Sequence, residues 1–69
     1  MKIKDLNKKY AIAFVHIPTG EVGRTDYNFS HIAAVQMCEE LDGICKTILH
    51  FPLAEGDDIQ IKAKERQHA

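Results

Sequence analysis

The segment from Tyr10 to Ile17 constrains the fold more than any other feature, because it is apolar on both of its faces. It is rich in β-branched and aromatic residues and stops at Pro18, a pattern typical of a β-strand. Side chains alternate across a strand, so one face carries Tyr10, Ile12 and Phe14. The other face carries Ala11, Ala13, Val15 and Ile17. A strand with two apolar faces must be covered on both sides of its sheet.

Turn residues after this strand predict a β-hairpin. Proline presets φ for a turn and glycine tolerates a positive φ, so the run Pro18-Thr19-Gly20 suits a short hairpin loop. The segment from Glu21 to Tyr27 is then expected to return as the second strand of the sheet.

A helix is predicted from His31 to Asp42, with the Ser30 hydroxyl as its N-terminal cap and Gly43 as a left-handed residue at its end. One side of this helix is apolar and is expected to pack on the sheet; its residues are Ala33, Ala34, Met37, Cys38 and Leu41. Ile32 and Val35 fall outside that side. Either another segment of the chain partly covers them, or they belong to a flank that binds a partner.

Two more strands are expected, from Ile44 to Phe51, which ends at Pro52, and from Ile59 to Lys64, where apolar and polar residues alternate. The predicted order is ββαββ, a small antiparallel sheet with one helix packed on a face, in the α+β class. Residues 1–69 are expected to form one small domain, with residues 1–8 and 65–69 loose at its ends.

A single helix covers only one face of such a sheet, which leaves the second face of the first strand to be explained. Either the sheet curls around a central first strand, or a second copy of the chain covers that face. The second reading predicts a homodimer, with a dimer face made of Ala11, Ala13, Val15 and Ile17.

The charges are unevenly distributed along the chain, although nine Lys and Arg residues nearly balance ten Asp and Glu residues. Both ends are basic, and the segment between them carries eight acidic residues against Arg24 and Lys46. An acidic middle favours a protein partner with a basic surface, and basic ends favour nucleic acid.

The leading hypothesis is a non-catalytic protein-binding module, an inhibitor or modulator of a larger complex, including one that handles nucleic acid. Its predicted binding residues are Ile32, Val35, Glu39, Asp42, Glu55, Asp57 and Asp58. In size and character the chain resembles small phage and mobile-element inhibitors such as the anti-CRISPR proteins, although no motif carries that resemblance. The alternative is a small nucleic-acid-binding regulatory protein that uses Lys2, Lys4, Lys8, Lys9, Lys62, Lys64 and Arg66.

The sequence predicts no enzyme, cofactor or metal site. Its only serine is expected to cap the helix, and Cys38 and Cys45 are expected to be reduced thiols, as in a cytoplasmic protein. The spacing of His31, Cys38, Cys45 and His50 matches no zinc motif. No apolar run is long enough to predict a membrane span or a membrane partner.

Overall fold

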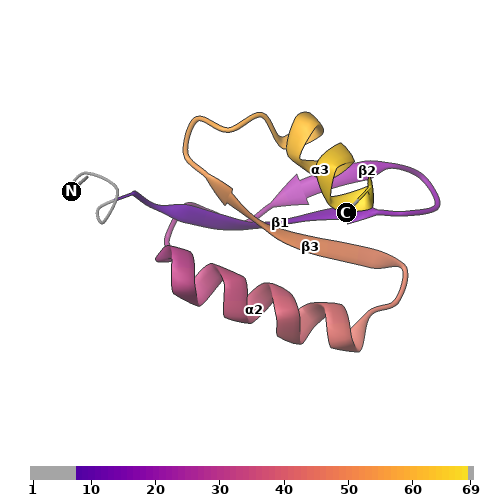
Figure 1. Cartoon of the computed structure of the whole chain (residues 1–69), viewed down its shortest axis with the longest axis horizontal. Coiled ribbons are helices and arrows are strands. Elements are labelled where there is room, and N and C mark those ends of the chain that lie inside the picture. The colour runs from indigo at the N-terminus through magenta and orange to yellow at the C-terminus, as the bar shows by residue number, and fades with distance from the viewer. Residues whose placement is uncertain (1–7, 69) are drawn as a thin grey trace.

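The computed structural model describes residues 8–68, which form a three-stranded sheet and two helices (Figure 1). The strands are β1 (Tyr10–His16), β2 (Glu21–Arg24) and β3 (Ile48–Ala54), and the helices are α2 (His31–Ile44) and α3 (Ile59–His68). Strand β1 lies in the middle of the sheet and is antiparallel to both neighbours. The α+β class and the antiparallel sheet are confirmed, but the predicted order ββαββ is wrong because the last element is a helix.

The C-terminal helix α3 replaces the strand that the alternation from Ile59 to Lys64 predicts. The Asp58 carboxylate accepts hydrogen bonds from the backbone N–H groups of the next turn, at 2.9 Å from Gln60 N and 3.2 Å from Ile61 N, so it starts a helix. Among the apolar residues at every second position, Ile59 and Ala63 are four residues apart. A helix places residues with this spacing on the same face. Ile59 and Ala63 face the sheet, while Ile61 points away and is 57% exposed.

The C-terminal end that was predicted to be loose, residues 65–69, overlaps helix α3. Residues 65–68 belong to α3, so they form a regular turn of helix. Within residues 1–8, only Lys8 is among the described residues, and it precedes β1 outside any regular element.

The two helices cover opposite faces of the sheet. Helix α2 contacts β1 and β3, and its buried residues Ala34 and Cys38 pack with Ile12. Helix α3 contacts all three strands, and its Ala63 packs with the alternate residues of β1. Because successive side chains of a strand point to opposite faces, these two clusters lie on the two sides of β1.

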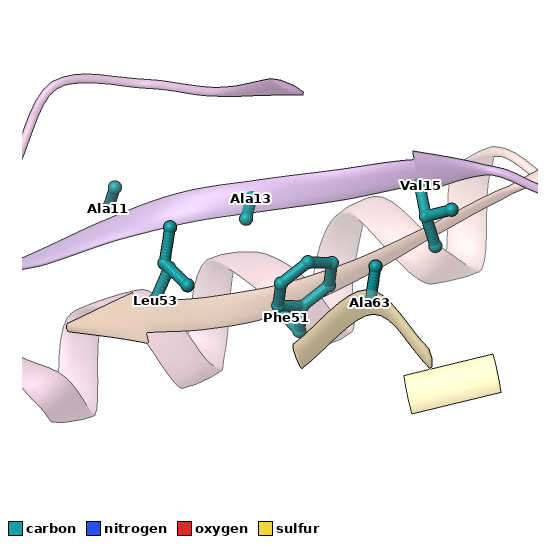
Figure 2. Close-up of a cluster of buried hydrophobic side chains, with 6 residues drawn as sticks. All are labelled: Ala11, Ala13, Val15, Phe51, Leu53 and Ala63. Atoms are coloured by element: carbon teal, nitrogen blue, oxygen red, sulfur yellow. The ribbon is translucent and has the colours of Figure 1, made fainter. Parts of the chain in front are cut away.

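The face under α3 is the main core of the protein (Figure 2). It consists of Ala11, Ala13, Val15, Phe51, Leu53 and Ala63. Three residues of the predicted dimer face, Ala11, Ala13 and Val15, are therefore buried inside one chain. The fourth, Ile17, follows β1 and is 45% exposed. The predicted dimer face is therefore wrong for these three residues, because α3 covers the face that a single helix would leave open. A homodimer through another surface stays a prediction.

The start of α2 forms as predicted, and its end does not. The Ser30 hydroxyl accepts a hydrogen bond from the Ala33 N–H at 3.2 Å, which confirms the N-terminal cap. Gly43, however, lies inside the helix with a negative φ, because α2 continues to Ile44. The helix ends in an extended Cys45, whose N–H donates to the Leu41 carbonyl at 3.0 Å, so no left-handed glycine is needed.

The hairpin is confirmed, although β2 is shorter than predicted. Gly20 has a φ of +77°, and its N–H donates to the His16 carbonyl at 2.7 Å. Regular pairing stops after Arg24, because the hydroxyl of Thr25 accepts the hydrogen bond from Ile12 N at 3.0 Å in place of a backbone carbonyl. The chain then bends at Tyr27 and meets β1 once more at Phe29, which forms an isolated bridge with Tyr10.

Strand β3 starts later than predicted and runs through Pro52. Pro52 pairs with Ile12, whose N–H and carbonyl both bond to Thr25 on the side of β2. The backbone groups of this pair therefore point away from each other, and the missing proline N–H falls on the outer edge of the sheet. Proline is tolerated there because it removes no bond between β1 and β3.

Candidate functional site

The outer edge of β3 is closed by side chains from both helices and from the turn before α3. The His50 N–H donates to Asp42 Oδ1 at 2.7 Å, and the Ala54 N–H donates to Asp57 Oδ2 at 3.2 Å. Between them Pro52 has no N–H to offer. The His50 carbonyl accepts from Arg66 Nε at 3.1 Å. Another strand would find few free backbone groups along this edge.

Asp42 joins three elements at the edge of β3. Its Oδ1 lies 2.9 Å from His50 Nδ1, and because a carboxylate only accepts, this ring nitrogen carries the proton. Its Oδ2 accepts from Arg66 Nη2 at 2.7 Å. All three side chains are half-buried, so water screens the ion pair with Arg66 only partly. The cluster fixes the end of α2 to β3 and to α3.

The electrostatics of this cluster favour a charged Asp42. Burial by itself raises the pKa of the Asp42 carboxyl, but hydrogen bonds from His50 and Arg66 outweigh it and hold the pKa below its usual 3.8. The pKa of the Cys38 thiol shifts in the opposite direction. Burial, with a smaller contribution from the negative charge of Asp42, raises the pKa of Cys38 to about 11. Cys38 is therefore a neutral, buried thiol at physiological pH and a weak nucleophile.

The predicted helix residues of the binding site do lie together. Ile32, Val35, Glu39 and Asp42 follow each other at intervals of three and four residues, which places them on one flank of α2. We call these four residues the α2 flank. Because Asp42 bonds to His50 at the outer edge of β3, the α2 flank borders that edge. Ile32 is 71% exposed, Glu39 is exposed and Val35 is half-buried.

The other predicted acidic residues form a separate group in the turn between β3 and α3. Asp57 accepts from the Ala54 N–H, and Asp58 caps α3, so both carboxylates have internal roles. Glu55 is exposed, and its N–H donates to the Lys9 carbonyl at 3.2 Å. The acidic middle of the chain is thus divided between α2 and this turn.

Five of the seven predicted nucleic-acid-binding residues are described, and they lie in two segments, the residues before β1 and helix α3. Lys62 lies 3.7 Å from Glu65, and Arg66 pairs with Asp42, whereas Lys64 is exposed. These three residues belong to a helix on the face of the sheet, so they do not extend an edge strand. Lys8 and Lys9 are exposed before β1. Lys2 and Lys4 lie outside the described residues.

Sequence reasoning missed His50 and Arg66 as partners of Asp42. The separations from Asp42 are 8 and 24 residues, and both contacts depend on how β3 and α3 pack against α2. No local spacing in the sequence reports them. The only sequence signal is an acidic residue at the end of a helix, where a carboxylate is unfavourable unless a cation lies beside it.

Residues 8–68 contain no detectable pocket and no cluster of three or more His, Cys, Asp or Glu side chains arranged to hold a metal ion. Neither helix in this part of the chain has the length and apolar character needed to cross a membrane. Comparisons with protein-family models, with curated proteins and with solved structures found no match for this chain.

Proposed function

We propose that this chain is a non-catalytic protein-binding module, and that the α2 flank attaches it to a basic surface of a larger protein or complex whose activity it modulates. The observation that carries the proposal is the position of Ile32 and Glu39, two turns apart on one exposed flank of a helix whose end is fixed by Asp42. Such a flank presents an apolar anchor beside a negative charge on a rigid support.

The charge of α2 supports a basic partner. The helix contains Glu39, Glu40 and Asp42 in its second half, and it has no basic residue in its last turn. Only Asp42 lies in the last turn, near the negative pole of the helix dipole, and Arg66 offsets that unfavourable position. Glu39 and Glu40 are exposed, and neither makes an ion pair within the described residues. A basic partner surface would pair with these two carboxylates.

The exposed isoleucine supports an apolar centre for the same contact. Full burial of an isoleucine side chain contributes about 1.5–3 kcal/mol. In the free chain Ile32 is 71% exposed, so most of this stabilisation can be gained only when a partner buries its side chain. Val35, one turn along the same flank, extends the apolar strip toward the half-buried Asp42.

Affinity capture from extracts of the source organism tests the proposal, with Ile32→Asp and Glu39→Lys compared with the wild-type chain. We expect each variant to reduce recovery of one captured protein by at least about tenfold, since tenfold corresponds to 1.4 kcal/mol. Ile61→Asp is the matched control, because Ile61 is 57% exposed on the other helix, and it should leave recovery unchanged. Binding of the captured protein should also weaken with added salt.

Two results would contradict the proposal. One is equal loss of the captured protein with Ile32→Asp and Ile61→Asp, which would indicate a general effect on solubility. The other is capture of nucleic acid alone, with loss of binding in Lys64→Glu. That second result would favour the alternative function, which rests on the exposed Lys64 and on the exposed Lys8 and Lys9.

A further inference from the structure

We propose that the outer edge of β2 binds an extended segment of another protein as a fourth strand of the sheet. The segment we infer carries a large apolar side chain opposite Gly23 and a Lys or Arg opposite Glu21, with one residue between them. This surface is distinct from the α2 flank, which lies along the other edge of the sheet (Figure 1).

The backbone of β2 leaves hydrogen-bonding groups open. Gly23 pairs with Phe14 and Glu21 pairs with His16, and these β1 residues direct their backbone groups toward β2. The backbone groups of Val22 and Arg24 therefore point outward. They have no hydrogen-bond partner among residues 8–68. An extended chain is the ligand that satisfies alternate N–H and carbonyl groups along a strand.

The open backbone groups of β2 contrast with the closed edge of β3. On β3 the outward N–H groups of His50 and Ala54 are taken by carboxylates, and Pro52 has none. Proteins protect their sheet edges in such ways to prevent pairing with other chains. Among the described residues, side chains cap the outward N–H groups of β3 but not those of β2, which is protected only by its short length and its charged ends.

An apolar surface lies beside the open edge. Helix α2 has no close backbone contact with β2, so this side of the sheet is not covered there by a helix. The Phe14 ring lies over Gly23, because a Cβ atom at Gly23 would be 2.5 Å from Phe14 Cζ. Phe14 is half-buried, so part of its ring is open to solvent. A side chain opposite Gly23 would meet the Phe14 ring.

The side chains of β2 identify the partner as a foreign segment. A second copy paired through its own β2 would place Gly23 and Glu21 on this face and would offer the Phe14 ring no apolar side chain. Glu21 is exposed and shares its face with Gly23, so a basic residue opposite it completes the recognition pattern.

The test uses a phage-displayed library of random octapeptides, selected on the full-length chain. We expect enriched peptides with an apolar residue and a basic residue separated by one position. The chain is short enough for total synthesis, and methylation of the Val22 amide nitrogen should reduce the affinity of these peptides at least about tenfold, because it removes only an outward donor. Methylation at Lys46, in the exposed bend before β3, should leave the affinity unchanged.

A second variant keeps the test independent of the folding of the methylated chain. Glu21→Lys leaves the backbone intact, and the same library should then yield acidic residues in place of basic ones. The proposal fails if no peptide is enriched, or if enriched peptides bind the Val22-methylated chain as tightly as the wild-type chain. It also fails if the wild-type chain forms a dimer that this methylation dissociates, since the occupant would then be a second copy. None of these measurements involves Ile32 or Glu39, so the proposed function is judged separately.

Discussion

We expect the substitution Val15→Asp to unfold the protein. Val15 is 1% exposed in the core between β1 and α3, so its replacement buries a carboxylate with no polar partner. The expected loss exceeds about 4 kcal/mol, which is comparable to the whole stability of a domain of this size. Circular dichroism and urea titration would measure it.

Ile17→Asp provides the matched control for this substitution. Ile17 is the next residue of the same alternation, but it follows β1 and is 45% exposed, so the loss should stay below about 1 kcal/mol. A Val15→Asp chain that kept its fold and changed only from dimer to monomer would contradict the packing of α3 on the sheet. It would restore the dimer face that the sequence predicts.

Asp42→Ala has the second largest expected effect. It removes the acceptor from the His50 N–H, from the His50 ring and from Arg66 at once, and leaves half-buried donors without a partner. We expect a loss of about 3 kcal/mol in the free energy of unfolding. Glu39→Ala, one turn earlier on the same flank and exposed, should cost less than about 0.5 kcal/mol. Similar losses for the two variants would show that the cluster does not hold α2.

The same cluster predicts a dependence of stability on pH. The pKa of Asp42 is lower in the folded chain than its usual 3.8, so its contribution to stability is complete above about pH 4. That contribution is lost as the pH falls through the folded pKa. In urea titrations between about pH 6 and pH 2, Asp42→Ala should lose less stability on acidification than the wild-type chain. If the free energy of unfolding fell equally with pH in the two proteins, Asp42 would not be the source of this pH dependence.

Local signals in the sequence were sufficient for the first half of the fold. The turn residues before Gly20, the alternation in β1 and the Ser30 cap all act over a few residues, and each appears as expected. The last element was missed because Ile59, Ile61 and Ala63 fit both a strand and a helix. The Asp58 cap decides between them, and a cap is a stronger signal than three alternating residues.

The candidate sites were only partly accessible from the sequence. The α2 flank follows from helical spacing, which a sequence displays directly. The closed edge of β3 does not, because it depends on Asp42 and Arg66, which meet only after both helices have packed on the sheet. The open edge of β2 depends on strand order, which local patterns do not specify. The proposed binding edge of β2 therefore rests on the difference between the two edges of the sheet.

Amide hydrogen exchange of the free chain, followed residue by residue by NMR, measures most directly how the closed edge of β3 differs from the open edge of β2. We expect the amides of His50 and Ala54 to exchange at least about tenfold more slowly, relative to their intrinsic rates, than those of Val22 and Arg24. Equal protection of the four amides, or stronger protection of Val22 and Arg24, would contradict a sheet with one closed and one open edge.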